Sequence, residues 1–136
     1  MTARRVLIVD DSLLMRTVIA DIVSSDPDFE VVGEAVDGMD ALEKAAALRP
    51  EIILLDIEMP RLDGIGALKQ LRLASLARVI VVSSAAQIGS PQAVEARRLG
   101  AVDVIAKPTG ALSLDLEARQ GHAIVRAMRL ACGLDG

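Results

Sequence analysis

Five short aliphatic runs alternate with longer segments of helical spacing along this chain. The runs span residues 4–9, 29–36, 51–55, 78–82 and 101–106. Three of them are almost continuously apolar, which is typical of parallel strands covered on both faces. The run at 29–36 alternates more with polar residues, as an edge strand does. Because parallel strands need crossover connections, five β/α units in a row predict one parallel sheet with helices on both faces.

Helical patterns fill the intervals between these runs. The first expected helix carries Leu14, Val18 and Ile22 at four-residue spacing after Ser12, a candidate N-cap. The other expected helices span 38–49, 63–73, 90–100 and roughly 113–131. Gly100 stands where a helix C-cap is expected, because glycine adopts the left-handed conformation at low cost.

Composition limits the class of protein. A chain of 136 residues without an internal linker predicts a single domain over 1–136. The net charge of −4 disfavours nucleic acid and anionic membranes as partners. No apolar run approaches the roughly 20 residues that span a bilayer. The N-terminus does not resemble a signal peptide, and the single Cys132 fits a reducing compartment, so we expect a cytoplasmic protein.

Three carboxylates stand at the ends of two expected strands. Asp10 and Asp11 follow the first strand, and Asp56 follows the third. Ligands of an open parallel sheet bind at the carboxyl ends of its strands, near the point where strand order reverses. For the three acids to meet there, the first and third strands must be neighbours. This predicts the order 2-1-3-4-5 of a doubly wound, flavodoxin-like α/β sandwich.

Such a cluster of acids predicts a cation site. Neighbouring carboxylates repel, and Mg²⁺ suits an open site with few carboxylates that also holds phosphate oxygens. Lys107 ends the fifth strand and Ser83 ends the fourth, so a positive charge and a hydroxyl are expected at the same edge. Taken singly, Asp10 and Asp11 are ordinary helix caps and Lys107 an ordinary surface lysine. Their joint position at the ends of four strands favours a functional site.

The order and spacing of four segments resemble the response-regulator receiver domain over essentially the whole chain. They are VLIVDDS (6–12), ILLDIEMPRLDG (53–64), VIVVSS (79–84) and LGAVDVIAKP (99–108). The resemblance implies a CheY-like fold and a role in two-component signal transduction. A sensor histidine kinase would pass a phosphoryl group to the domain, which would itself be a phosphoacceptor and not an enzyme.

The site residues that the resemblance implies are carried over position by position. Asp56 resembles the phosphoacceptor, Lys107 the lysine that binds the phosphoryl group, and Ser83 the switch hydroxyl. The implied Mg²⁺ ligands are Asp10, Asp11, Asp56 and the backbone carbonyl of Glu58. The switch would act on the face formed by the fourth helix, fifth strand and fifth helix, which would bind an output partner. Val104 stands where receivers usually carry Tyr or Phe, so the aromatic rotamer switch is absent.

The amino-acid sequences of several segments are similar to those of the regulatory half of the chemotaxis protein-glutamate methylesterases. These segments are DDSLLMR, SSDPDFEVVGEAVDG, LDIEMPRLDG and VSSAA. The similarity implies a CheA-like kinase as partner. No Gly-x-Ser-x-Gly motif is present, so we expect no output domain within 1–136, and the activity of any longer parent protein stays open. Whether phosphorylation drives dimerisation also stays open.

Two other functions remain as alternatives. A Mg²⁺-dependent phosphohydrolase with an aspartyl nucleophile would also need clustered acids, and steady turnover of a phosphomonoester would favour it. Enzymes resembling the haloacid-dehalogenase group place Asp-x-Asp after the first strand, whereas Asp10 and Asp11 are adjacent. An orphan receiver that is never phosphorylated would act as a binding module, and failure to bind Mg²⁺ would favour that function.

Overall fold

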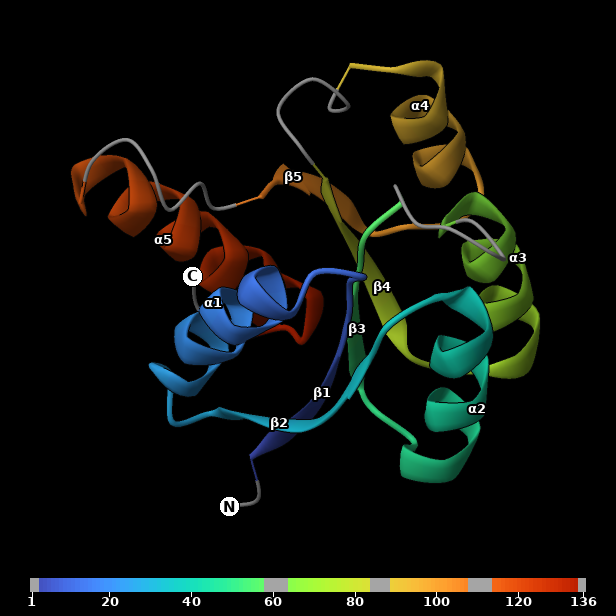
Figure 1. Cartoon of the computed structure of the whole chain (residues 1–136), viewed down its shortest axis with the longest axis horizontal. Helices are drawn as coiled ribbons and strands as arrows, with labels where there is room; N and C mark the ends of the chain where they lie inside the picture. The colour runs from blue at the N-terminus through green and yellow to red at the C-terminus, as the bar shows by residue number, and fades with distance from the viewer. Residues whose placement is uncertain (1–2, 58–63, 84–88, 108–113, 135–136) are drawn as a thin grey trace.

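The computed structural model describes residues 3–57, 64–83, 89–107 and 114–134 (Figure 1). Within these ranges, strands and helices alternate as β1 (Arg4–Val9), α1 (Leu13–Ser24), β2 (Phe29–Ala35), α2 (Gly38–Leu48), β3 (Ile52–Leu55), α3 (Gly64–Ala74), β4 (Arg78–Ser83), α4 (Pro91–Arg98), β5 (Asp103–Ala106) and α5 (Leu114–Ala131). All strand pairs are parallel, in the order β2-β1-β3-β4-β5. The predicted fold class and strand order are confirmed.

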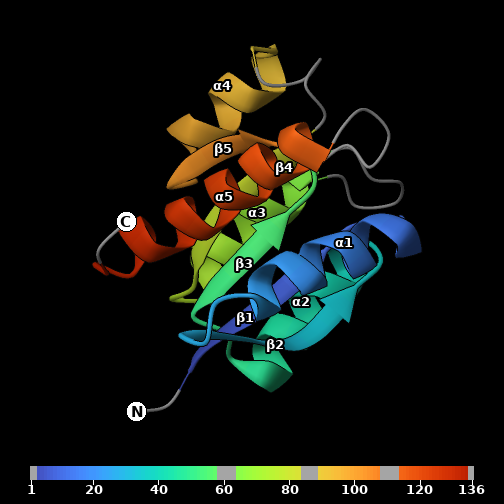
Figure 2. The same ribbon diagram turned by 90° about the vertical axis from the view of Figure 1, so that its left-hand side faces the viewer.

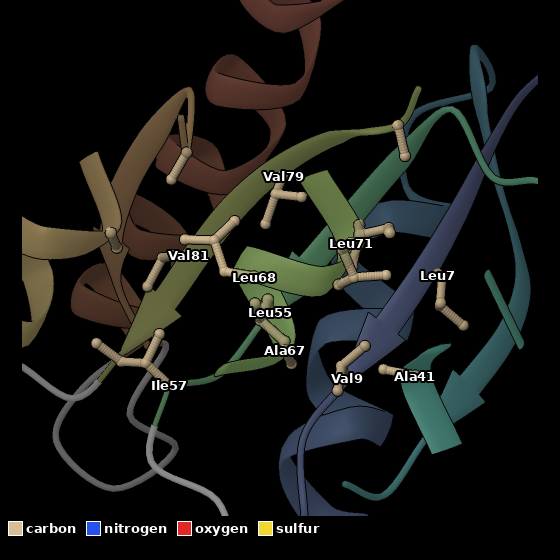
Figure 3. Packing of buried hydrophobic residues seen from close by; sticks show 14 of the residues in the cluster. Leu7, Val9, Ala41, Leu55, Ile57, Ala67, Leu68, Leu71, Val79 and Val81 are labelled. Atoms are coloured by element: carbon tan, nitrogen blue, oxygen red, sulfur yellow. The ribbon is translucent and has the colours of Figure 1, made fainter. Parts of the chain in front are cut away.

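Helices cover both faces of the sheet, with α1 and α5 on one side and α2, α3 and α4 on the other (Figures 1 and 2). Successive residues of a strand point to opposite faces, so each strand contributes to both cores. In β1, Leu7 and Val9 pack beneath α2–α4, whereas Val6 and Ile8 pack beneath α1 and α5. This two-sided burial explains why the central strands are continuous apolar runs. Figure 3 shows the first of these cores from close by.

The connection from α4 to β5 differs from the expected boundaries. The Gly100 N–H donates to the Arg97 carbonyl (3.1 Å), and the Ala101 N–H donates to the Ala96 carbonyl (3.0 Å). Together with the positive φ of Gly100 (108°), these bonds form the Schellman motif that ends a helix. The motif includes Ala101, the first residue of the expected strand, and β5 begins at Asp103.

The last helix packs on the sheet through one apolar stripe. Ile124 and Met128 of α5 are completely buried. Arg129 Nη1 lies 3.0 Å from Asp26 Oδ2 and 2.8 Å from Asp28 Oδ2, which ties α5 to the α1–β2 connection. Among the helices described, none is both long and apolar enough to cross a membrane.

Candidate functional site

Backbone hydrogen bonds hold the predicted acids at one edge of the sheet. β1 and β3 are neighbours, with Val9 paired to Leu55. Beyond this pair, the Asp56 N–H donates to the Val9 carbonyl and the Asp10 N–H donates to the Ala35 carbonyl, both at 3.0 Å. Each aspartate therefore extends a strand ladder by one residue, and both side chains emerge at the carboxyl ends of the strands.

The three acids meet as the sequence predicts. Asp10, Asp11 and Asp56 each offer a carboxylate oxygen, and these oxygens lie within 4.8 Å of one another. Asp10 and Asp56 are both 1% exposed, whereas Asp11 is exposed to solvent. The cluster therefore combines two buried carboxylates with one that remains accessible from outside.

Lys107 reaches the two buried acids from the end of β5. Its Nζ donates a hydrogen bond to Asp56 Oδ2 at 3.0 Å and lies 3.2 Å from Asp10 Oδ2. Burial by itself would lower the pKa of Lys107, but the hydrogen bond and charge of Asp56 and the charge of Asp10 outweigh it and raise the pKa. Lys107 is therefore a fixed cation between the two carboxylates.

Burial is unfavourable for the ionised carboxylate of Asp10. Burial raises its pKa, and neither the Ser12 N–H, which donates to Oδ1 at 2.8 Å, nor Lys107 cancels this effect. The 3.2 Å contact of Asp10 Oδ2 with Lys107 is an ion pair without hydrogen-bond alignment, and the described residues give this buried oxygen no hydrogen bond. Three carboxylates against one ammonium form a donor set that fits a hard divalent cation such as Mg²⁺.

Ser83 brings a buried hydroxyl to the same edge. Its side chain is completely buried at the end of β4, and its Oγ has no hydrogen-bond partner among the described residues. The Ser83 carbonyl accepts a hydrogen bond from the Lys107 backbone N–H at 2.6 Å. The backbone hydrogen bond therefore holds the two residues side by side. An unsatisfied buried hydroxyl costs about 1–3 kcal/mol, which an oxygen of a bound anion would offset.

Glu58 and Val104 are the remaining residues that the sequence connects with the site. Glu58 lies outside the described residues, so its carbonyl remains a predicted metal ligand only. Val104 is 5% exposed and packs in the core beneath α2–α4. Val104 therefore places a buried aliphatic side chain at the position where receivers usually carry Tyr or Phe.

Arg16 also contacts the site, and no sequence motif predicts this role. Its Nη1 donates to the Asp10 carbonyl at 2.8 Å, and its Nε donates to Glu34 Oε1 at 3.0 Å. A weak signal was present, since Ser12 and Arg16 are four residues apart and so share one side of α1. The pairing with Glu34 could not be predicted, because it depends on how β2 lies against α1 in the fold.

Comparison with known proteins assigns the family. Residues 6–119 match the response regulator receiver domain. This chain belongs to that family. The receiver domain is 54% identical over 110 residues to the protein-glutamate methylesterase/protein-glutamine glutaminase of Thermotoga maritima, covering 81% of the chain and 32% of that relative. A relative of the same name in Syntrophomonas wolfei is 47% identical over 116 residues, covering 85% of the chain and 33% of the relative. The chain thus spans about a third of these proteins.

Solved structures agree with this assignment. The response regulator domain of Thermotoga maritima CheB superposes with a TM-score of 0.86 at 46% identity, covering 99% of this chain and 100% of that one. A chain from the structure of the P1 domain of CheA3 in complex with CheY6 from R. sphaeroides superposes with a TM-score of 0.81 at 41% identity, covering 98% and 99%. The predicted resemblance to receiver domains of the methylesterase type is confirmed. Receiver domains serve two-component signalling as phosphoacceptors, and they bind Mg²⁺ in an acidic pocket like the one formed here.

Proposed function

We propose that this receiver domain takes a phosphoryl group onto Asp56 from the phosphohistidine of a CheA-like sensor kinase, in a Mg²⁺-dependent reaction. The observation that carries the proposal is the placement of Asp56. This carboxylate lies within 4.8 Å of Asp10 and Asp11 and 3.0 Å from Lys107, so that acids and a fixed cation surround one nucleophile. The kinase assignment rests on the relatives, among which CheB and CheY proteins occur.

Asp56 is the nucleophile of the proposed reaction. Its carboxylate oxygen attacks phosphorus, an O–P bond forms as the P–N bond of the donor breaks, and the bonding electron pair stays on the histidine nitrogen. Mg²⁺, held by Asp10, Asp11, Asp56 and the Glu58 carbonyl, would neutralise charge on the phosphoryl oxygens.

Lys107 and Ser83 complete the phosphoryl site in this proposal. Lys107 exchanges its contact with Asp10 for one with a phosphoryl oxygen, while its partner Asp56 carries the new group. Ser83 then donates its hydroxyl, which has no partner among the described residues, to another of these oxygens. Phosphorylation adds about −1.5 to −2 charges, which is enough to reposition both side chains.

The signal would leave the site through the ends of β4 and β5. Ser83 pairs with Ala106 across these strands, and a shift there would bias the α4–β5–α5 face between two arrangements. This face would bind a downstream protein, or an esterase domain if the full protein is a methylesterase like the relatives. We further propose that residues 1–136 form one domain that acts in the cytoplasm.

The test is intact-mass spectrometry of the domain incubated with acetyl phosphate. We expect one added phosphoryl mass with Mg²⁺, none after chelation, and none for Asp56→Asn. Asp28→Asn is the matched control, because Asp28 lies at the opposite end of β2, and it should be labelled like the wild type. Equal labelling of Asp56→Asn would refute the assignment. Release of many phosphates per protein molecule would identify a phosphohydrolase, and absence of both labelling and Mg²⁺ binding would identify a binding module.

A further inference from the structure

Arg16 links the turn that carries two of the acids to the edge strand of the sheet. Its side chain is only 11% exposed, and its two donor nitrogens point to different elements. Nη1 donates to the Asp10 carbonyl at 2.8 Å, whereas Nε is paired with Glu34 Oε1 at 3.0 Å. The planar fork of arginine suits such a two-sided contact, because both donors are fixed relative to each other.

Glu34 is itself held in place from the other face of the sheet. The Glu34 carbonyl accepts a hydrogen bond from Lys44 Nζ of α2, and the same Nζ lies 3.3 Å from Asp40 Oδ2. Arg16 therefore pairs with a residue whose backbone is fixed by β2 and α2. The pair connects the β1–α1 turn to a rigid part of the fold.

Arg16 restrains the β1–α1 turn through the backbone of Asp10 and not through its carboxylate. Within the described part of the chain, Asp10 makes two other hydrogen bonds. Its N–H donates to the Ala35 carbonyl at 3.0 Å, and its Oδ1 accepts the Ser12 N–H, which occupies one of the carboxylate oxygens that a metal would use. Arg16 bonds the backbone carbonyl instead, which restrains the turn and leaves the Asp10 carboxylate oxygens available. Without it, the repulsion among the acids would favour turning the Asp10 or Asp11 side chain away.

We propose that Arg16 is a positioning residue of the metal site, which holds the β1–α1 turn through Glu34 so that Asp10 and Asp11 present their carboxylates together. This inference rests on the proposed use of Mg²⁺. It assigns to Arg16 an effect on metal affinity through geometry. Among the described residues, Arg16 bonds the Asp10 backbone carbonyl and Glu34, and neither bond involves a carboxylate of the cluster. Positioning groups around metal ligands typically contribute 10–100-fold to metal affinity.

Charge and geometry predict opposite signs for Arg16→Met. Removing a positive charge beside three acids should tighten Mg²⁺ binding if Arg16 acted by its charge alone. Loss of the positioning contact should weaken binding, by about tenfold. Arg16→Lys keeps the charge but not the rigid fork, so we expect weaker binding there too, by a smaller factor.

The experiment is a Mg²⁺ titration of the isotope-labelled domain, followed by NMR through the backbone amides of Asp10, Asp11 and Ser12. The dispersion of each spectrum reports folding independently of affinity. Arg129→Met is the matched control, because it removes an arginine with two ion pairs at the far end of α5, and it should bind like the wild type.

Each outcome separates the inference from the proposed function. Failure of the wild-type domain to bind Mg²⁺ would overturn both. Wild-type binding with equal or tighter binding by Arg16→Met and Arg16→Lys would overturn the inference alone. In a double-mutant cycle, Arg16→Met and Glu34→Gln should lose less affinity together than the sum of their separate losses. Fully additive losses would contradict the role of the pair.

Discussion

At the residue scale, Lys107 explains how two buried carboxylates persist in the free domain. It lies 3.0 Å from Asp56 and 3.2 Å from Asp10, so one ammonium serves both acids. This compensation is incomplete, because burial still raises the pKa of Asp10. Removing the charge of Asp10, while Lys107 keeps its ion pair with Asp56, should therefore increase the stability of the metal-free domain.

We predict that Asp10→Asn stabilises the domain without Mg²⁺ at neutral pH, by on the order of 1 kcal/mol. The amide keeps the shape of the side chain and removes a charge whose burial is unfavourable. Urea unfolding followed by circular dichroism measures the change. Asp21→Asn, at an exposed position of α1, should change the free energy of unfolding by less than about 0.5 kcal/mol. A loss of stability in Asp10→Asn would show that the Lys107 pairing outweighs burial.

The residues of the site differ in how far sequence could predict them. Asp10, Asp56 and Ser83 could be identified because each directly follows or ends an apolar run, and parallel strands end at a common edge. The contact of Lys107 with both acids, and the bridge from Arg16 to Glu34, depend on side-chain reach across strands. No local pattern encodes such a distance, so these contacts required the structure.

At the element scale, the α4–β5 connection depends on one backbone conformation. Gly100 has φ 108°, and a Cβ added there would lie 2.6 Å from Arg72 Nε of α3. The sequence predicted that Gly100 ends the helix, but it did not predict that the Schellman hydrogen bonds include Ala101, which therefore does not belong to β5. The expected strands were otherwise close to the observed ones, since apolar runs and turn residues mark where strands can pair.

We predict that Gly100→Ala lowers the free energy of unfolding by about 1–3 kcal/mol, because alanine is strained at positive φ. Contact with Arg72 adds to this cost, although the flexible arginine can move. Gly89→Ala serves as control, since a Cβ at Gly89 has no neighbour within 4 Å. Thermal unfolding of both variants provides the measurement, and equal stability of the two would argue against the strained conformation.

At the scale of the whole molecule, the acid cluster couples stability to pH and metal. A group whose pKa is higher in the folded state than in the unfolded state stabilises the fold at low pH. This contribution is complete at pH values below the unfolded-state pKa, where the group is protonated in both states. That contribution is lost as pH rises through the raised pKa of the folded state. Asp10 therefore lowers the stability of the metal-free domain as pH increases toward neutrality.

We predict that Mg²⁺ reverses this loss, because it binds the ionised acids of the folded domain and stabilises it by mass action. Adding Mg²⁺ should raise the melting temperature at neutral pH. The increase should shrink as pH falls through the raised pKa of Asp10, where protons compete with the metal. Differential scanning calorimetry at constant ionic strength, with K⁺ in place of Mg²⁺ as control, measures the effect. An increase that is independent of pH, or that K⁺ reproduces, would exclude the acid cluster as its origin.

The chemical identity of the modified residue tests the account most directly. The domain phosphorylated in the presence of Mg²⁺ is treated with borohydride, which reduces an acyl phosphate to an alcohol and so converts a phosphorylated aspartate to homoserine. Peptide mass spectrometry then locates the converted residue. The account predicts conversion at Asp56, which lies beside Lys107 at 3.0 Å, and at neither Asp10 nor Asp11. Conversion at Asp10 or Asp11, or a phosphorylated protein in which Asp56 stays unchanged, would contradict it.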